Sequence, residues 1–111
     1  MQKRSKYIHL WKTRFFILTQ NYLFAFTGVE NDADCTMALD LISIESVSEI
    51  LSENKTKKEF VVKTLGGDYY LRAENDNIMK KWKDEIEKAY KSKKHELQKN
   101  EYRSNKSNGV F

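Results

Sequence analysis

Two basic side chains, Lys12 and Arg14, stand two residues apart at the start of an apolar run that includes Phe16 and Leu18. Successive side chains of a strand point to opposite faces, so these four residues would share one face, with neighbours roughly 7 Å apart. An Arg guanidinium can hold two phosphate oxygens at once, and a Lys ammonium adds a movable point charge. The spacing therefore predicts an anion-binding rim above two apolar core residues.

The composition predicts one soluble domain. The chain has 111 residues, a formal net charge of +4 and a 32% share of charged residues. That length supports one hydrophobic core but not two. No apolar run approaches the roughly 18 residues of a membrane span, and the N-terminal residues lack the apolar stretch of a signal peptide. We therefore expect a cytoplasmic protein.

The charge is segregated along the chain. Residues 1–29 carry five basic and no acidic side chains, whereas residues 30–60 carry eight acidic and three basic ones. The two stretches thus have charges of +5 and −5. Such a dipole would orient the molecule at a charged surface, although a purely solubilising exterior explains the same clusters.

Catalysis is not expected from this sequence. Cys35 is the single cysteine, so it permits neither an internal disulfide nor a zinc cluster built on thiolates. His9 and His95 lie far apart in the sequence, and no phosphate-binding loop or metal-ligand spacing occurs. We expect a protein that is not an enzyme and that needs no metal or cofactor.

Most of the chain up to about residue 73 is predicted to be antiparallel β structure, because short apolar segments alternate with turn residues. The predicted strands cover residues 1–6, 12–19, 22–27, 36–39, 42–47, 59–64 and 69–73. Gly66 and Gly67 favour a tight turn between the last two strands, since glycine accepts a positive φ at little cost.

One amphipathic helix is predicted after the strands. Ile78, Trp82, Ile86 and Ala89 recur at helical spacing, and Asn75 can cap the N-terminal end of the helix. Trp82 has the largest apolar area on this stripe, so we expect it to be a structural residue of the core.

The order of these segments resembles the pleckstrin homology (PH) domain, over nearly the whole chain to about Ser92. Lys3 followed by Lys12-Thr13-Arg14 looks like the family's phosphoinositide signature, and the run from Phe15 to Thr19 is most similar to cytohesin-type domains. The resemblance implies a mostly β fold: a seven-stranded, partly open antiparallel barrel of two nearly orthogonal sheets, capped by the C-terminal helix.

The resemblance also gives the domain organisation. The PH domain would cover residues 1–92, with its first strand clipped at its start because Met1 falls where the family has a leucine. Residues 93–111 would form a polar, basic extension of the helix that ends in a mobile tail from about Asn100.

By this resemblance, the headgroup of a lipid would bind at the first hairpin. The main contacts are predicted for Lys3, Lys12 and Arg14, with supplementary contacts from Lys6, Arg4 and His9. A candidate apolar tip that enters the membrane comprises Tyr7, Ile8 and Leu10, which are otherwise ordinary strand residues. The structural residues behind the site are Trp82, Phe16 and Leu18.

Three departures from the family pattern predict limited selectivity among headgroups. Ala25 stands where selective members often have a phosphate-bonding tyrosine. The loop before the fourth strand offers Glu30, Asp32 and Asp34 where an arginine can occur, and the turn at Gly66-Gly67 lacks an insertion. Phosphatidic acid or a general anionic surface is therefore a serious competitor to a particular phosphoinositide.

The function expected from these features is a non-catalytic module that recruits its parent protein to the cytosolic face of a membrane as a peripheral protein. Its ligand would be an anionic headgroup, either a phosphoinositide or phosphatidic acid. The alternative is a protein-interaction module of the same superfold, with a peptide or small GTPase partner at the acidic residues 30–60 or at Lys80, Lys81 and Lys83. We expect a monomer, and no nucleic-acid partner because no recognised module accompanies the basic residues.

Overall fold

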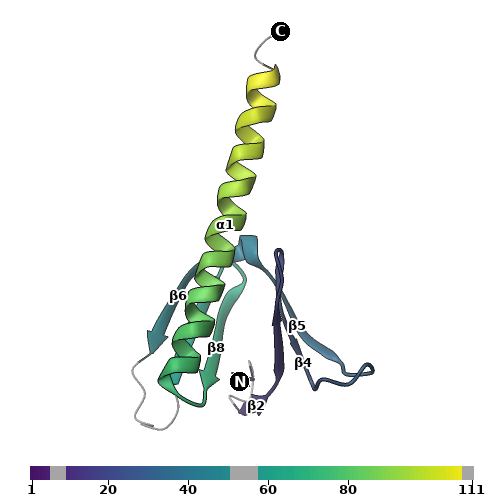
Figure 1. Cartoon of the computed structure of the whole chain (residues 1–111), viewed down its shortest axis with the longest axis vertical. Coiled ribbons are helices and arrows are strands. Elements are labelled where there is room, and N and C mark those ends of the chain that lie inside the picture. Colours follow the sequence, from purple (N-terminus) through teal and green to yellow (C-terminus); the bar gives the residue numbers. More distant parts are fainter. Residues whose placement is uncertain (6–9, 51–57, 109–111) are drawn as a thin grey trace.

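The chain folds into two antiparallel sheets and one long C-terminal helix, as the computed structural model in Figure 1 shows. The structure describes residues 1–5, 10–50 and 58–108, with the backbone alone for residues 100–108. The strands are β1 (Gln2–Arg4), β2 (Trp11–Thr13), β3 (Phe15–Leu18), β4 (Tyr22–Phe26), β5 (Cys35–Asp40), β6 (Ile44–Ile50), β7 (Lys58–Thr64) and β8 (Gly67–Ala73). The short 3-10 helix η1 spans Leu41–Ser43, and α1 spans Asp76–Asn108.

The two sheets have separate hydrogen-bond ladders. One sheet has the strand order β2-β1-β8-β7-β6, and the other has the order β3-β4-β5. They are not closed into a continuous barrel, so the predicted mostly β, partly open fold with a C-terminal helix is confirmed. Among the described residues, no helix combines the length and the hydropathy needed to cross a bilayer.

The predicted strand over residues 12–19 is divided between the two sheets. β2 pairs with β1, whereas β3 pairs with β4, and the division falls at Arg14. The backbone N–H of Arg14 still donates to the Met1 carbonyl at 3.0 Å, which ends the ladder with the first strand. Seven strands were predicted, and the described residues form eight, because one predicted strand turns the corner between the sheets.

The core lies between the sheets and α1. The largest fully buried side chains come from both sheets, from η1 and from α1: Phe60, Leu23, Leu41, Ile44, Leu71, Met79, Ile86 and Val62. Phe16 is also buried, and Leu18 is partly buried against this cluster. The alternation of β3 thus sends one set of its side chains into the core.

The helix begins as the sequence predicts. The Asn75 side-chain oxygen accepts a hydrogen bond from the Ile78 N–H at 2.9 Å, and its carbonyl accepts from the Met79 N–H at 3.1 Å. Asp76 adds a negative charge in the first turn, where the helix dipole favours it. The helix then continues through Asn108, although residues 100–108 were expected to be irregular.

The buried face of α1 differs from the predicted stripe. Ile78 is 38% exposed, whereas Met79, Ile86 and Tyr90 are buried. These three residues also recur at helical spacing, so the face that packs on the sheets is rotated toward Met79. Trp82 is partly buried at its margin and contacts Phe16 edge to face, with the ring centroids 6.0 Å apart.

Candidate anion-binding site

Three cations meet at the first hairpin. Lys3 of β1 and Lys12 of β2 are direct partners in the antiparallel register, so their side chains lie on the same face of the sheet. Arg14 follows two residues after Lys12 at the corner between the sheets. All three residues line a cavity of about 220 Å³, together with Arg4, Ser5 and Thr36. The structure thus brings together Lys3, Lys12 and Arg14, the three residues for which the main headgroup contacts were predicted.

A larger cavity adjoins this one. It has a volume of about 390 Å³ and shares Lys3, Arg4, Ser5 and Thr36 with the smaller cavity. Its remaining wall is formed by residues 37–38 of β5 and residues 66–70, which include the glycine turn and the start of β8. Residues of β1 and of β5 thus line both cavities.

The wall of the larger cavity depends on a tight turn. Gly67 has a φ of +135°, a backbone conformation that residues other than glycine rarely adopt. The Thr64 hydroxyl donates to the Gly67 carbonyl at 2.7 Å and accepts from the Gly66 N–H at 3.1 Å. These bonds stabilise a short turn that contains no inserted residues. The turn forms part of the wall of the larger cavity, which Lys3 also lines.

The site is electrostatically unbalanced. Burial lowers the pKa of the Lys3 ammonium from its ordinary value of 10.5, and the neighbouring Arg14 charge lowers that pKa further. Among the ion pairs between described residues, none engages Lys3, Lys12 or Arg14. The Arg14 guanidinium donates a hydrogen bond to the adjacent Thr13 carbonyl, at 2.9 Å. An anion in the cavity would offset the repulsion among the three cations.

Replacing Lys3 with methionine is expected to stabilise the fold while weakening anion binding. Below its folded pKa, Lys3 is charged in both states, and burial beside Arg14 then disfavours the folded state. Because the folded pKa is depressed, wild-type stability rises with pH between that pKa and 10.5, and the methionine variant lacks this rise. Because Lys3 is only partly buried and solvent screens its repulsion by Arg14, we expect a gain of a few tenths of a kcal/mol, and less than about 1 kcal/mol, in unfolding free energy at pH 7. Urea unfolding of both proteins at pH 7 and pH 10 measures the gain in stability and its dependence on pH.

The control for this prediction is Lys63→Met on the exposed side of β7. It makes the same chemical change away from the cavity, so it should leave the unfolding free energy within about 0.5 kcal/mol of wild type. A Lys3→Met variant that is less stable than wild type at pH 7 would show that the Lys3 charge is compensated in the fold.

Arg4 was predicted to supplement the site, and in the structure its guanidinium lies on an aromatic ring beside the cavities. Arg4 pairs with Trp11 in the register, so its side chain belongs to the face opposite to that of Lys3 and Lys12. The guanidinium carbon lies 3.8 Å from the centroid of the Tyr70 ring. Arg4 therefore lines the wall of both cavities while its charge stacks on an aromatic ring.

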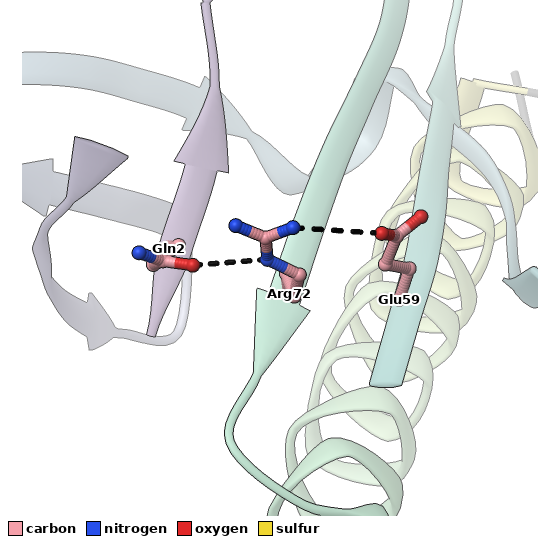
Figure 2. Close-up of polar contacts among 3 residues, drawn as sticks. All are labelled: Gln2, Glu59 and Arg72. Atoms are coloured by element: carbon pink, nitrogen blue, oxygen red, sulfur yellow. Dashed lines mark hydrogen bonds and ion pairs between the residues drawn. The ribbon is translucent and has the colours of Figure 1, made fainter. Parts of the chain in front are cut away.

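A second arginine fastens the hairpin to the sheet from that same opposite face. Figure 2 shows Arg72 between Gln2 and Glu59: its Nε donates to the Gln2 side-chain oxygen at 2.9 Å, and its Nη1 lies 3.8 Å from a Glu59 carboxylate oxygen. The Arg72 guanidinium carbon also lies 4.3 Å from the centroid of the Trp11 ring. One side chain thus links β8 to β1, β2 and β7, and it supports the strands that carry Lys3 and Lys12.

Sequence analysis did not single out Arg72. Its partners are separated from it along the chain by up to 70 residues, so only the register of the sheet brings them together. The alternating pattern of the predicted last strand was the one available signal, because it placed Arg72 and Tyr70 on one face.

Some of the other residues predicted for the site lie outside the part of the chain that the structure describes. Lys6, Tyr7, Ile8 and His9 lie outside the described residues. Leu10, the remaining residue of the candidate membrane tip, is 56% exposed. Ala25 is fully buried opposite Phe16 and Met37, so the position expected for a tyrosine forms part of the core.

Comparison with known proteins places this architecture in a family. The model of the PH domain family matches residues 1–91. The chain belongs to the PH domain family. This result covers both sheets and the part of α1 that packs on them.

Two relatives illustrate the breadth of the match. A PH domain-containing protein of Dictyostelium discoideum is 30% identical over 89 residues, which are 79% of this chain and 19% of that protein. The chain thus spans about a fifth of the length of this curated relative. The PH domain of Slm1, crystallised in complex with phosphoserine, is similar in fold with a TM-score of 0.60 and 23% identity, over 77% of this chain and 85% of that one. These matches do not support the narrower likeness to cytohesin-type domains.

Proposed function

We propose that this PH domain recruits its parent protein to the cytosolic face of membranes by binding anionic lipid headgroups between Lys3, Lys12 and Arg14. The observation that carries the proposal is the convergence of these three cations on one cavity, without an ion pair to any described carboxylate. PH domains are in general non-catalytic modules that bind lipid headgroups or proteins. The described residues contain no cluster of potential metal ligands beside this cavity.

The arrangement suits a phosphate monoester. A dianionic phosphate monoester has three terminal oxygens. Two of them can accept hydrogen bonds from the Arg14 guanidinium, and the third oxygen with the remaining lone pairs can accept from the two lysines. Phosphatidic acid and the phosphoinositides both present such a group. The smaller cavity would hold the phosphate, and the adjoining 390 Å³ has room for the rest of a larger headgroup. The phosphoserine in complex with the Slm1 PH domain is a phosphate monoester too, which supports this choice.

The expected affinity is moderate. Each basic residue near an anionic leaflet contributes about 1 kcal/mol, and salt screens that contribution. Three cations with the exposed Leu10 beside them give reversible binding, so a second contact elsewhere in the parent protein would be needed for stable anchoring.

Vesicle co-sedimentation tests the proposal. Neutral phosphatidylcholine vesicles would be supplemented with phosphatidic acid, phosphatidylserine or a phosphoinositide, with the total negative charge matched. We expect the phosphatidic acid and phosphoinositide vesicles to retain more protein than the phosphatidylserine vesicles. Equal retention on all three would show that the domain senses surface charge without a headgroup site, and equal retention on neutral vesicles would overturn the proposal.

A further inference from the structure

The solvent-facing side of the three-stranded sheet is apolar. Phe15 and Ile17 of β3 lie opposite Phe26 and Phe24 of β4 in the register, and Tyr22 continues the row along β4. We call these five residues the apolar outer face. Phe15, Ile17 and Tyr22 are 43%, 39% and 39% exposed. The other side of the same strands supplies the buried core residues, so this sheet is apolar on both faces.

The rings of β4 form a continuous ladder on this face. The Tyr22 and Phe24 centroids are 5.4 Å apart with nearly parallel rings, and the Phe24 and Phe26 centroids are 6.0 Å apart. Neighbouring aromatic rings in such a row present their faces or edges to one side of the strand. A flat aromatic surface of this kind attracts both apolar groups and cations.

Carboxylates flank both ends of the ladder. Beyond Phe26, the loop to β5 carries the exposed Glu30, Asp32 and Asp34. The loop is held by paired hydrogen bonds between residues 27 and 34, and the Glu30 carboxylate lies over Gly28, where a side chain would collide with it. At the Tyr22 end, Asp40 is the register partner of Tyr22. None of these four carboxylates is in an ion pair between described residues.

These charges decide among the groups that could cover the apolar outer face. An anionic membrane would be repelled by Glu30, Asp32 and Asp34. Two copies that met face to face about a twofold axis would bring the acidic ends of their ladders together, which is also unfavourable. A cationic segment fits, because the apolar stem of a lysine can lie on the rings while its ammonium reaches the flanking carboxylates.

The chain itself carries such a segment. The C-terminal part of α1 extends beyond both sheets (Figure 1), although Ser92, Lys93 and Glu96 still line a small cavity with Gln20 of the turn between β3 and β4. This helix extension, residues 91–108, contains six basic and two acidic residues, so its net charge of +4 equals that of the whole chain. The remainder of the chain is therefore neutral. Because α1 is continuous from Asp76, the extension cannot turn back onto its own three-stranded sheet without a break in the helix.

We propose that the helix extension of one copy binds across the apolar outer face of a second copy. A twofold arrangement would let each copy donate its extension to the other, which closes the assembly as a dimer. The contact of one helix with a three-stranded sheet is small, so the dimer is weak and sensitive to salt. The dimer is an alternative to the monomer expected from the sequence, and it does not depend on headgroup binding.

Sedimentation equilibrium across a wide concentration range, at low and high salt and without lipid, tests the proposal. We expect the mass of the wild-type chain to approach that of a dimer as concentration rises at low salt, and to fall toward the monomer at high salt. Phe15→Ser/Tyr22→Ser and Lys91→Gln/Lys99→Gln should each weaken dimerisation at least about tenfold. Lys81→Gln/Lys88→Gln, which neutralises exposed lysines of α1 before the extension, should leave it unchanged.

A charge exchange gives the sharper test. Glu30→Lys/Asp32→Lys and Lys91→Glu/Lys99→Glu should each reduce self-association. Their mixture should form a heterodimer, because both of its contacts join opposite charges, one as in the wild type and one with the charges exchanged. Circular dichroism melts establish that each variant is folded before it is mixed. A wild-type chain that stays monomeric at all concentrations, a dimer that persists in Phe15→Ser/Tyr22→Ser, or a mixture that remains monomeric would overturn the proposal.

Discussion

Replacing Lys12 and Arg14 together with alanine is expected to weaken binding to anionic vesicles by at least about 30-fold, which corresponds to about 2 kcal/mol. The lysine should contribute about 1 kcal/mol near a charged leaflet, and a charge-assisted hydrogen bond from the arginine contributes roughly 1.5–3 kcal/mol. Lys3 remains in the cavity and retains part of the attraction. Vesicle titrations at fixed salt, followed by co-sedimentation, measure the change.

The matched control for this pair is Lys81→Ala/Lys88→Ala. Both lysines are exposed on α1, and their removal changes the net charge by the same two units. Because salt screens distant charges within about 10 Å, we expect less than about a threefold loss of binding in the control. Equal losses in the two pairs would mean that net charge governs attraction, and no loss in the first pair would remove the cavity as the binding site.

Much of the fold could be predicted because its signals are local. The glycine turn at Gly66-Gly67 and the capping residue Asn75 act over a few residues, and the structure places both as predicted. The division of the second predicted strand at Arg14 could not be read in this way. The alternation of Lys12, Arg14, Phe16 and Leu18 is uninterrupted in the sequence, so it does not show that the chain passes from one sheet to the other at Arg14.

The site was predictable to the extent that it is built by adjacent strands. The resemblance to PH domains pointed to Lys3 together with Lys12 and Arg14, and in the structure Lys3 and Lys12 are paired in one hairpin with Arg14 two residues further on. Arg4, as the neighbour of Lys3, belongs to the opposite face of the strand, although it also lines both cavities. The link from Arg72 to Gln2 and Glu59 joins residues that are distant in sequence, so it required the order of strands in the sheet.

A pair of isoleucines on α1 tests how the helix packs on the sheets. Ile86 has no exposed surface, and its replacement by alanine should lower the free energy of unfolding by about 2–5 kcal/mol, through lost burial and the cavity that remains. That loss is a large share of the 5–15 kcal/mol typical of a small domain, so the variant would unfold at a much lower urea concentration. Equilibrium urea unfolding, monitored by tryptophan fluorescence, measures the change.

Ile78→Ala is the control, because it makes the same chemical change two turns earlier on the same helix. Ile78 is 38% exposed, so its replacement should change the unfolding free energy by less than about 1 kcal/mol. The sequence stripe that joins Ile78, Trp82 and Ile86 predicts instead that both variants lose several kcal/mol. Similar losses would therefore favour a helix rotated toward Ile78, whereas a large difference would support the face centred on Met79, Ile86 and Tyr90. The rotation matters for the fold, because the same face brings Trp82 against Phe16, directly behind the strand that follows Arg14.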